Sequence, residues 1–404
     1  MKIREIMLGK GRERRFRSSR KPRHEPIGLH QKVKDIIDSV KSTVEEAKEG
    51  ARIQHIEDLV IWDGAKGGAE SIQKLHQIES SPSSISIKWD GSPAVIFGRN
   101  EQGQFVLTDK SGFGAKGYNG KVTSGEDLEK MFLGRAKGEI DDSRRDFAST
   151  MKGIWDTVES VIPDDFRGYL HGDLLWFSTP LSKNGRLVFK PNVTTYSVDA
   201  KSDIGQKIIK FDVGIVVHQA IDLEGNKNNV DMSQLRGGRT FIMPPVLVSK
   251  SPGIDVPEID RLENYLKSSA NAIDKLLAVP PEQKMADFGN ILYTYINNSV
   301  KAGNLDGLGT HFTAWVDSSK LSGPKKERVV AWVEQNSDGF KAIFEFIKGV
   351  MTVKNTIIKA LDSQSADIEA STNGEKGGEG YVIGKDVKLV NRAGFTAANM
   401  NAER

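Results

Sequence analysis

The sequence predicts an α+β fold, in which a strand-rich antiparallel body is preceded by helices and interrupted by a large helical insertion. Strand-like runs separated by glycine turns occupy residues 84–108 and 167–217. Apolar residues at helical spacing fill residues 256–368, and strand character returns only over residues 379–390. We therefore expect three parts: a basic arm over 1–27, a body made of 28–255 and 369–404, and a helical insertion over 256–368.

The composition is that of an ordinary globular protein and excludes several kinds of site. Of the 404 residues, 38% are hydrophobic and 27% are charged, and none is cysteine. Disulfides, thiolate metal sites and a cysteine nucleophile are thereby excluded, and a reducing compartment is favoured. No apolar run reaches the ~18 residues of a membrane helix, and no secretory signal is recognisable. We expect a cytoplasmic protein that does not bind membranes.

Positive charge is concentrated at the N-terminus. Residues 1–24 contain ten Lys or Arg and two acids, in a chain whose net charge is only +3. Such a segment predicts a disordered arm that binds nucleic-acid phosphates without regard to base sequence. A solubilising or targeting tail is the alternative.

Helical periodicity identifies the helices in order. An apolar stripe predicts a helix over 29–48, and a second helix over about 67–78 follows the segment 56–62. Residues 128–162 are largely helical and stop at Pro163. The block 256–368 must contain several helices, because it is interrupted at Pro280-Pro281, Gly307-Leu308-Gly309 and Ser322-Gly323-Pro324.

Strands are expected between these helical regions. A hairpin over 84–97 turns at Asp90-Gly91, since glycine accepts a positive φ, and a return strand follows over 104–108. The remaining strands are expected at 167–177, broken by Gly172-Asp173, at 187–198, at 207–217 and, after a polar loop over 371–378, at 379–383 and 385–390.

Lys88 is the first candidate for chemistry. It ends a mostly buried strand, and the alternation places it on the opposite face to Ile85 and Ile87. Partial desolvation and nearby positive charge leave a lysine amine unprotonated and nucleophilic. An ordinary hairpin with a solvated lysine is the alternative that these residues alone leave open.

A glycine-rich stretch follows this lysine. Between residues 97 and 118, five glycines are interspersed with Arg99, Lys110 and Lys116. Glycine lets backbone N–H groups approach a polyphosphate, and the cations would complete the cradle. A flexible polar loop is the alternative, and the GxxxxGK[ST] pattern of a P-loop is absent from the sequence.

Four motifs in order resemble the covalent nucleotidyltransferase superfamily, which comprises ATP-dependent DNA and RNA ligases and mRNA capping enzymes. The sequence KWDG at 88–91 matches the motif of the nucleotide-accepting lysine, and Arg99 resembles the arginine that contacts the ribose. The sequence HGDL at 171–174 resembles the third motif, EGYV at 379–382 matches the next, and Lys388 matches the last lysine. The chain also resembles uncharacterised proteins of large tailed bacteriophages.

The resemblance implies an antiparallel-sheet nucleotidyltransferase core, ATP-grasp-like, with a role for each motif. Lys88 would attack the α-phosphorus of ATP and hold AMP. Lys388, with Lys385 as its rival, would neutralise the charge on the phosphoryl oxygens. Asp173 and Glu379 would supply oxygen ligands for Mg²⁺.

The resemblance also implies contacts to the nucleotide. Ile87, Asp90, Gly91 and Arg99 would lie around it, beside the lysine. An aromatic side chain would sandwich the base, and the candidates are Tyr196 and Phe211. Phe211 is favoured because KFDVGI at 210–215 looks more like the family motif. His218, at a strand end, is expected to pack or cap rather than bind a ligand.

The chain departs from the family pattern in several places. Pro93 stands where DNA ligases usually have arginine, and Asp173 stands where glutamate is more frequent. The spacing from Glu379 to Lys388 is short. We also expect no C-terminal OB-fold, since few residues follow the last motif.

The motifs predict an ATP-dependent polynucleotide ligase that joins RNA or DNA ends. RNA is slightly favoured, because RNA ligases of this superfamily often lack the OB-fold. A non-catalytic phage nucleic-acid-binding or virion protein on the same fold is the first alternative. HGDL also resembles the catalytic loop of aminoglycoside and choline kinases, but Ser178 stands where these small-molecule kinases have asparagine.

Overall fold

The computed structural model of the protein is a mixed α+β structure with largely antiparallel sheets, which confirms the predicted class. It describes residues 54–114, 118–136, 138–243, 246–248, 250–364, 367–372, 374–378, 380–384 and 387–394. These residues belong to one unit, Arg52–Arg404. The expected arm over 1–27 and helix over 29–48 lie outside the described residues. Over the described ranges, no helix combines the length and apolar character that crossing a membrane requires.

The strand that carries Lys88 belongs to a four-stranded sheet. Its order is β1-β15-β14-β2, with β1 parallel to β15 and the other pairs antiparallel. The sheet therefore joins the beginning and the end of the described chain. Its strands are β1 (Gln54–His55), β2 (Ile85–Lys88), β14 (Gly380–Ile383) and β15 (Val387–Val390).

A six-stranded sheet follows in the chain, in the order β10-β9-β5-β3-β4, with β11 parallel to β9. Three helices cover one of its faces, where Val95 and Leu170 share a core with Trp155. The strands are β3 (Ala94–Arg99), β4 (Phe105–Asp109), β5 (Gly168–Trp176), β9 (Val213–Ile221), β10 (Lys227–Asn228) and β11 (Thr240–Met243). The covering helices are α4 (Gly125–Leu133), α5 (Asp142–Gly153) and α6 (Trp155–Glu159), and a short α3 (Lys110–Phe113) follows β4.

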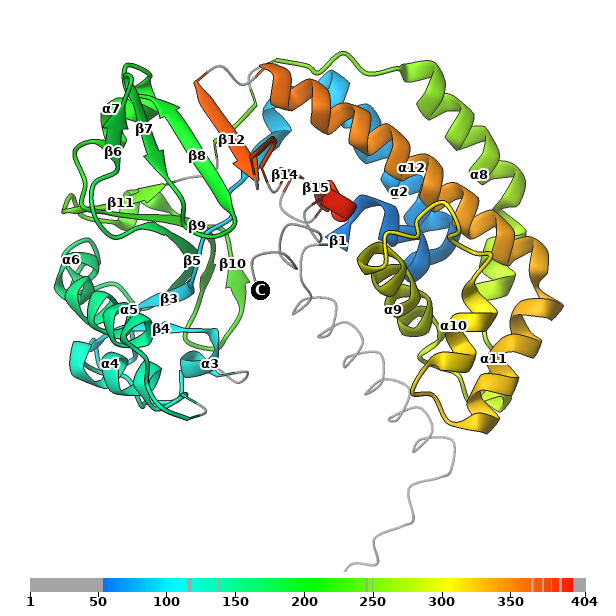
Figure 1. Cartoon of the computed structure of the whole chain (residues 1–404), viewed down its shortest axis with the longest axis horizontal. Coiled ribbons are helices and arrows are strands. Elements are labelled where there is room, and N and C mark those ends of the chain that lie inside the picture. Colours follow the sequence, from blue (N-terminus) through cyan, green and yellow to red (C-terminus); the bar gives the residue numbers. More distant parts are fainter. Residues whose placement is uncertain are drawn as a thin grey trace, which may run out of the picture. The chain divides into compact units, whose positions relative to one another are not determined.

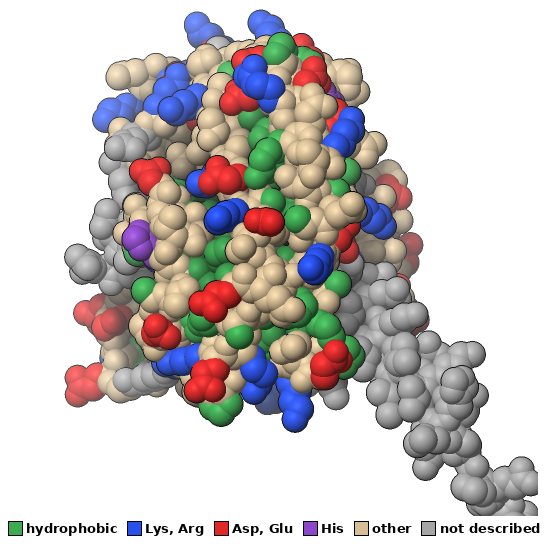
Figure 2. Space-filling model, turned by 90° about the vertical axis from the view of Figure 1, so that its right-hand side faces the viewer, with side chains coloured by type: hydrophobic (Ala, Val, Ile, Leu, Met, Phe, Trp, Pro, Cys, Tyr) green, Lys and Arg blue, Asp and Glu red, His purple; other side chains and the backbone are tan. Residues whose placement is uncertain are grey.

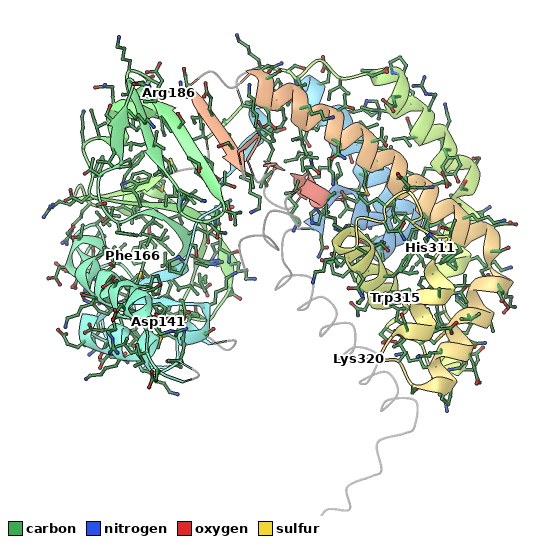
Figure 3. All side chains as sticks on the ribbon, in the orientation of Figure 1. Asp141, Phe166, Arg186, His311, Trp315 and Lys320 are labelled. Carbon is green, nitrogen blue, oxygen red and sulfur yellow. The ribbon has the colours of Figure 1, made fainter. Side chains whose placement is uncertain are left out.

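A third sheet has the order β13-β12-β8-β7-β6 and is antiparallel throughout. Arg186, labelled in Figure 3, ties its strands together. The Arg186 Nε donates to Ser197 Oγ at 2.7 Å, and the guanidinium lies 3.6 Å from Glu369. The elements are β6 (Leu181–Lys183), β7 (Arg186–Phe189), β8 (Thr194–Asp199), β12 (Ile368–Thr372) and β13 (Glu375–Lys376), with α7 (Asp203–Ile208) after β8.

Residues 256–364 contain the helices expected for the insertion. These helices share one core with the earlier helix α2 (Leu59–Ser80). Ile85, Ile383 and Leu389 of the four-stranded sheet belong to the same core. Figure 1 shows α12 running beside α2 and α8, in agreement with their extensive contacts. The helices are α8 (Val256–Leu277), α9 (Phe288–Lys301), α10 (Phe312–Ser318), α11 (Gly323–Gln335) and α12 (Ser337–Gln364).

The outer face of these helices carries mixed charge. In Figure 2, which views the molecule from its helical side, acidic and basic side chains are interspersed. A run of nucleic-acid phosphates would meet repulsion as well as attraction there. This face is therefore poorly suited to binding a nucleic-acid backbone.

The predicted hairpin over 84–97 is wrong. β2 pairs with β14, whereas β3 pairs with β4 and β5 in another sheet. The Asp90-Gly91 turn therefore connects two sheets instead of two neighbouring strands. The signal of a turn was correct, but the strand partners come from residues 380–383 and 168–173, which local sequence does not specify.

Other local differences have simple causes. The strand expected over 207–217 begins only at Val213, because the Ser202 side chain accepts a hydrogen bond from Gly205 N and caps α7. The loop expected over 371–378 contains the β12–β13 hairpin, in which Gly374 adopts φ +85°. β5 is continuous, since a bulge in its pairing with β9 accommodates Gly172. The helix expected over about 67–78 begins earlier, because α2 (Leu59–Ser80) continues across non-helical backbone at Asp63 and Gly64.

Candidate active site

Lys88 lies where two sheets meet. It is the last residue of β2, and the following residues lead directly into β3 of the six-stranded sheet. Trp89 fixes this connection, because its side chain is only 1% exposed and its ring lies 4.6 Å from that of Tyr196 and 6.1 Å from that of Phe189. The position of Lys88 is therefore set by the packed side chain that follows it.

Asp90 and Gly91 hold the turn in place. The Asp90 backbone N–H donates to the Tyr196 hydroxyl at 2.6 Å, and the Asn192 amide donates to the Asp90 carboxylate at 3.0 Å. Burial raises the pKa of Asp90, although its hydrogen bond to Asn192 and the charge of Lys88 act in the opposite direction. A Cβ added at Gly91 would lie 2.5 Å from the Cβ of Asp173, so only glycine fits between the two segments.

Lys88 and Lys388 project from the same face of the four-stranded sheet. Gly380 of β14 pairs with Lys88 on one side and with Val390 on the other, and Lys388 precedes Val390 by two residues. Because residues two apart on a strand point to the same face, both lysines leave the sheet on one side. Ile85 leaves on the other side and enters the helical core, as the alternation predicted.

His55 lies on this face too, directly opposite Lys388. Burial lowers the pKa of His55 well below its usual value, and the charges of Lys354, Lys388, Arg392 and Lys88 lower it further. The imidazole is therefore neutral at pH 7 and lies in the field of both site lysines. Sequence reasoning missed His55, because its position depends on the pairing of β1 with a strand more than 300 residues away.

Asp173 reaches the same region from β5. It pairs with Ala94, a few residues after Lys88, and packs against Gly91. The Asp173 carboxylate raises the pKa of Asp90, whereas Lys88 lowers it, so Asp90 lies within electrostatic range of both. Like charges on Asp90 and Asp173 repel, and a divalent cation would relieve that repulsion. Two side chains with oxygen ligands therefore lie in the same region as Lys88.

Two histidines flank Asp173. His218, which lies within β9, has its Nε2 3.0 Å from the Asp173 carboxylate. His171 Nδ1 is bonded to the Gln219 amide at 2.9 Å, while its Nε2 is buried and has no hydrogen-bond partner within the described ranges. Burial lowers the pKa of His171 to about 4, and nearby Lys110 adds to this effect. The register of β9, which sequence reasoning did not give, creates these contacts.

A buried ionic cluster lies just beyond β15. Lys354 Nζ is 2.6 Å from Glu57, and an Arg392 guanidinium nitrogen is 2.8 Å from Asp58. All four residues are at most 4% exposed. Burial raises the pKa of Asp58 to about 6, and the neighbouring Arg392 limits this rise. The cluster ties α12 to both ends of the described chain, and hence supports the strand of Lys388.

Arg99 has a structural position. Its Nε donates to the Pro163 carbonyl at 2.8 Å, and its guanidinium lies 3.0 Å from Asp164 and 3.2 Å from Glu159. The residue is only 7% exposed. These contacts tie β3 to the segment after α6, and the prediction that Arg99 contacts a ribose gains no support from them.

The expected base-binding residues are separated. Tyr196 lies beside Lys88 and is fully buried, whereas the favoured Phe211 stacks on Phe241 at 5.3 Å, before β9. The backbone N–H of Ile87 donates to the Val246 carbonyl at 2.8 Å and is part of strand pairing. The cavity lined by Lys88 and Tyr196 has a volume of about 30 Å³, which holds about one water molecule. A base would need more room than this.

Two predicted residues cannot be placed. Glu379, the expected metal ligand, and Lys385, the rival of Lys388, lie outside the described residues. Gly380, which follows Glu379, is paired with Lys88. Of the expected set, Lys88, Asp90 and Asp173 therefore share one region, with Gly91 and Tyr196 supporting it. Lys388 lies on the same sheet face as Lys88, with β14 between their strands.

Comparison with known proteins gives one match. Residues 51–404 match a protein-family model described as "Family of unknown function (DUF6267)". No curated protein and no solved structure matches the chain.

Proposed function

Because the chain belongs to this family, whose description assigns no activity, we propose a function from its own residues: an ATP-dependent polynucleotide ligase that acts through a lysyl-AMP intermediate on Lys88. The observation that carries the proposal is that Lys88 and Lys388 share one face of a sheet. Asp90 lies within electrostatic range of both Lys88 and Asp173, so two carboxylates lie in the same region as the Lys88 amine. Amines and carboxylates so arranged suit a triphosphate with its metal ion.

The reaction would proceed by three displacements at phosphorus. The Lys88 amine attacks the α-phosphorus of ATP, so that an N–P bond forms, the bond to the bridging oxygen breaks, and pyrophosphate and a proton leave. A 5′-phosphate oxygen of the polynucleotide then displaces Lys88 and takes the AMP. Finally a 3′-hydroxyl attacks that 5′-phosphate, a phosphodiester forms, and AMP and a proton are released.

Other residues would act on the charge that builds up during these steps. Lys388 would neutralise the phosphoryl oxygens from the same side of the sheet as Lys88. Mg²⁺, bound by Asp173 with Asp90 or Glu379, would neutralise the phosphates further. His218 would hold the Asp173 carboxylate in its orientation through their hydrogen bond.

The test is covalent labelling of the protein by [α-³²P]ATP with Mg²⁺. We expect the wild type to carry a label that is stable to alkali and released by acid, as a lysine phosphoramidate is. We expect no label in Lys88→Ala, and labelling about 10²–10³ times slower in Lys388→Ala. Lys359→Ala, which removes an exposed lysine of α12, is the matched control and should label normally. Equal labelling of Lys88→Ala, or no label with ATP, GTP or NAD, would refute the proposal.

A non-catalytic nucleic-acid-binding protein is the second candidate, and the position of Arg99 favours it. The guanidinium of Arg99 binds Pro163 and Asp164 and so stabilises the fold, where the ligase hypothesis expects it to contact a ribose. This candidate predicts that RNA or DNA binds equally well to the wild type and Lys88→Ala, and that binding needs no ATP.

A further inference from the structure

The six-stranded sheet has a second face, opposite the one that α4–α6 cover. Leu170 and Leu174 of β5 pack into the core with those helices. Tyr169, His171 and Asp173 alternate with them and therefore lie on the other face. At the usual rise of a strand, Asp173 and Tyr169 are about 13 Å apart. This row of side chains leads from the Lys88 site to the far end of the sheet.

Exposed lysines flank the middle of this row. Lys110, just after β4, and Lys227, in β10, both act on the pKa of His171 through their positive charge. Both are exposed at the surface. β4, which Lys110 directly follows, and β10, which contains Lys227, lie on opposite sides of β5 in the sheet order. Phosphates of a strand that followed β5 would thus meet a positive charge on each side.

A cavity of about 520 Å³ lies at the far end of the row. The rings of Phe113, Tyr118 and Tyr169 form one part of its wall, with Phe113 and Tyr169 only 4.9 Å apart. The Tyr118 ring is fixed because its hydroxyl donates to the Val122 carbonyl at 2.7 Å. A cavity of this size, with aromatic and polar walls, is typical of a site for a small organic group.

The polar residues that line the cavity indicate which chemical group it would bind. Amide side chains of Gln102, Gln104 and Asn119 line it, and amides offer both donors and acceptors. The carboxylates of Glu101 and Asp222 also line it, and no described lining residue is Lys or Arg. A phosphate would be repelled inside the cavity, whereas a neutral base with donors and acceptors on its edge would be matched.

We propose that this cavity binds an unpaired nucleobase of a single-stranded nucleic acid whose backbone follows β5 past Lys110 and Lys227. That the strand's end reaches Lys88 rests on the proposed ligase function, but binding in the cavity does not. The span of about 13 Å corresponds to on the order of four nucleotides at the stacked spacing of DNA. The ligase substrate would therefore be single-stranded near the join, because a duplex cannot present a base to the cavity.

The test is equilibrium binding to the full chain, without ATP, of fluorescein-labelled 12-nucleotide oligo(U) and oligo(dT), followed by anisotropy. Stacking on an aromatic side chain contributes about 1–3 kcal/mol per base, so Tyr118→Ala should weaken binding about 5- to 150-fold. Tyr118→Phe keeps the ring and should bind within about twofold of the wild type. Tyr265→Ala, which removes a tyrosine of α8 that is 36% exposed, is the matched control and should have no effect.

A second measurement needs no variant. An oligonucleotide of abasic sites keeps the phosphates and lacks the bases, so it should bind the wild type more weakly than oligo(U) and should not distinguish wild type from Tyr118→Ala. The proposal is overturned if the wild type binds neither oligonucleotide, if Tyr118→Ala binds as well as the wild type, or if abasic and normal probes bind equally. Loss of binding in Tyr118→Ala with no ATP labelling of the wild type would refute the ligase and leave the cavity proposal standing.

Discussion

The buried ionic cluster behind β15 gives the sharpest prediction about stability. Lys354 and Glu57 have side chains that are 0% exposed, and their charged atoms are 2.6 Å apart. At an effective dielectric constant of about 20, that separation corresponds to about 6 kcal/mol of attraction. Desolvation of both groups offsets much of it in the intact pair. Removal of one partner, however, leaves a buried carboxylate without compensation.

Lys354→Met keeps the volume of the side chain and removes only its charge. Glu57 and Asp58 would then share the single positive charge of Arg392, which is 3.6 Å from Glu57. We expect the free energy of unfolding to fall by about 3–5 kcal/mol. Urea denaturation followed by tryptophan fluorescence measures this change. Lys359→Met, at an exposed position of the same helix, should change stability by less than about 0.5 kcal/mol.

The double variant Glu57→Gln/Lys354→Met tests the reasoning itself. It leaves the ion pair of Asp58 and Arg392, whose charges balance and whose charged atoms are 2.8 Å apart. The free energy of unfolding should therefore rise by more than about 1 kcal/mol relative to Lys354→Met. If Lys354→Met is as stable as Lys359→Met, the cluster does not stabilise the fold by ion pairing. If the double variant is no better than the single one, the loss comes from packing instead of charge.

Three further predictions concern the site. Because the pKa of His55 is lowered in the folded state, the unfolded chain binds an extra proton as pH falls below about 6.5, and the free energy of unfolding should decline from pH 7 to 5. In urea titrations at each pH, His55→Gln should reduce that decline. An unchanged dependence of the free energy of unfolding on pH would contradict the burial of a neutral imidazole. Gly91→Ala should abolish ATP labelling, since its Cβ would clash with Asp173. Gly153→Ala, at an exposed glycine of α5 with open space and an ordinary backbone conformation, should label normally. Arg99→Met should lower the free energy of unfolding by about 2–4 kcal/mol and leave the ATP dependence of labelling unchanged in the folded fraction. A large rise in the apparent dissociation constant for ATP would instead restore the predicted role of Arg99 at the ribose.

Local sequence predicted the elements around Lys88 better than their partners. The alternation of Ile85 and Lys88 correctly gave the two faces of β2, because side-chain direction is a local property of a strand. The hairpin was wrong, since a turn signal does not say which strands pair across it. His55 was missed for the same reason, and the contact of His218 with Asp173 likewise depends on strand register.

Arg99 shows a different limit. Its position at the end of β3 was predicted correctly, and only its direction was not. The guanidinium binds the carbonyl of Pro163 and the carboxylate of Asp164, which follow α6 more than 60 residues later. A buried arginine has five N–H donors, and these bond to the acceptors that the tertiary structure places nearby. A motif match at one arginine therefore predicts the position of its side chain poorly. The common face of Lys88 and Lys388 is a stronger observation, because it follows from continuous strand pairing.

The helices of residues 256–364 have a role that follows from where their core ends. Ile85, Ile383 and Leu389, from the strands that carry or pair with Lys88 and Lys388, lie in one core with α2, α8 and α12. The opposite face of the same sheet holds the two lysines, so the helices support the site from behind. They also bring two charged groups near it, since Asp362 of α12 lines the cavity beside Lys88 and the charge of Lys354 lowers the pKa of His55. A four-stranded sheet with one apolar face is not stable without such a cover. The helical block is thus part of the body that positions Lys88, and its removal should unfold the lysine sheet instead of merely changing the substrate.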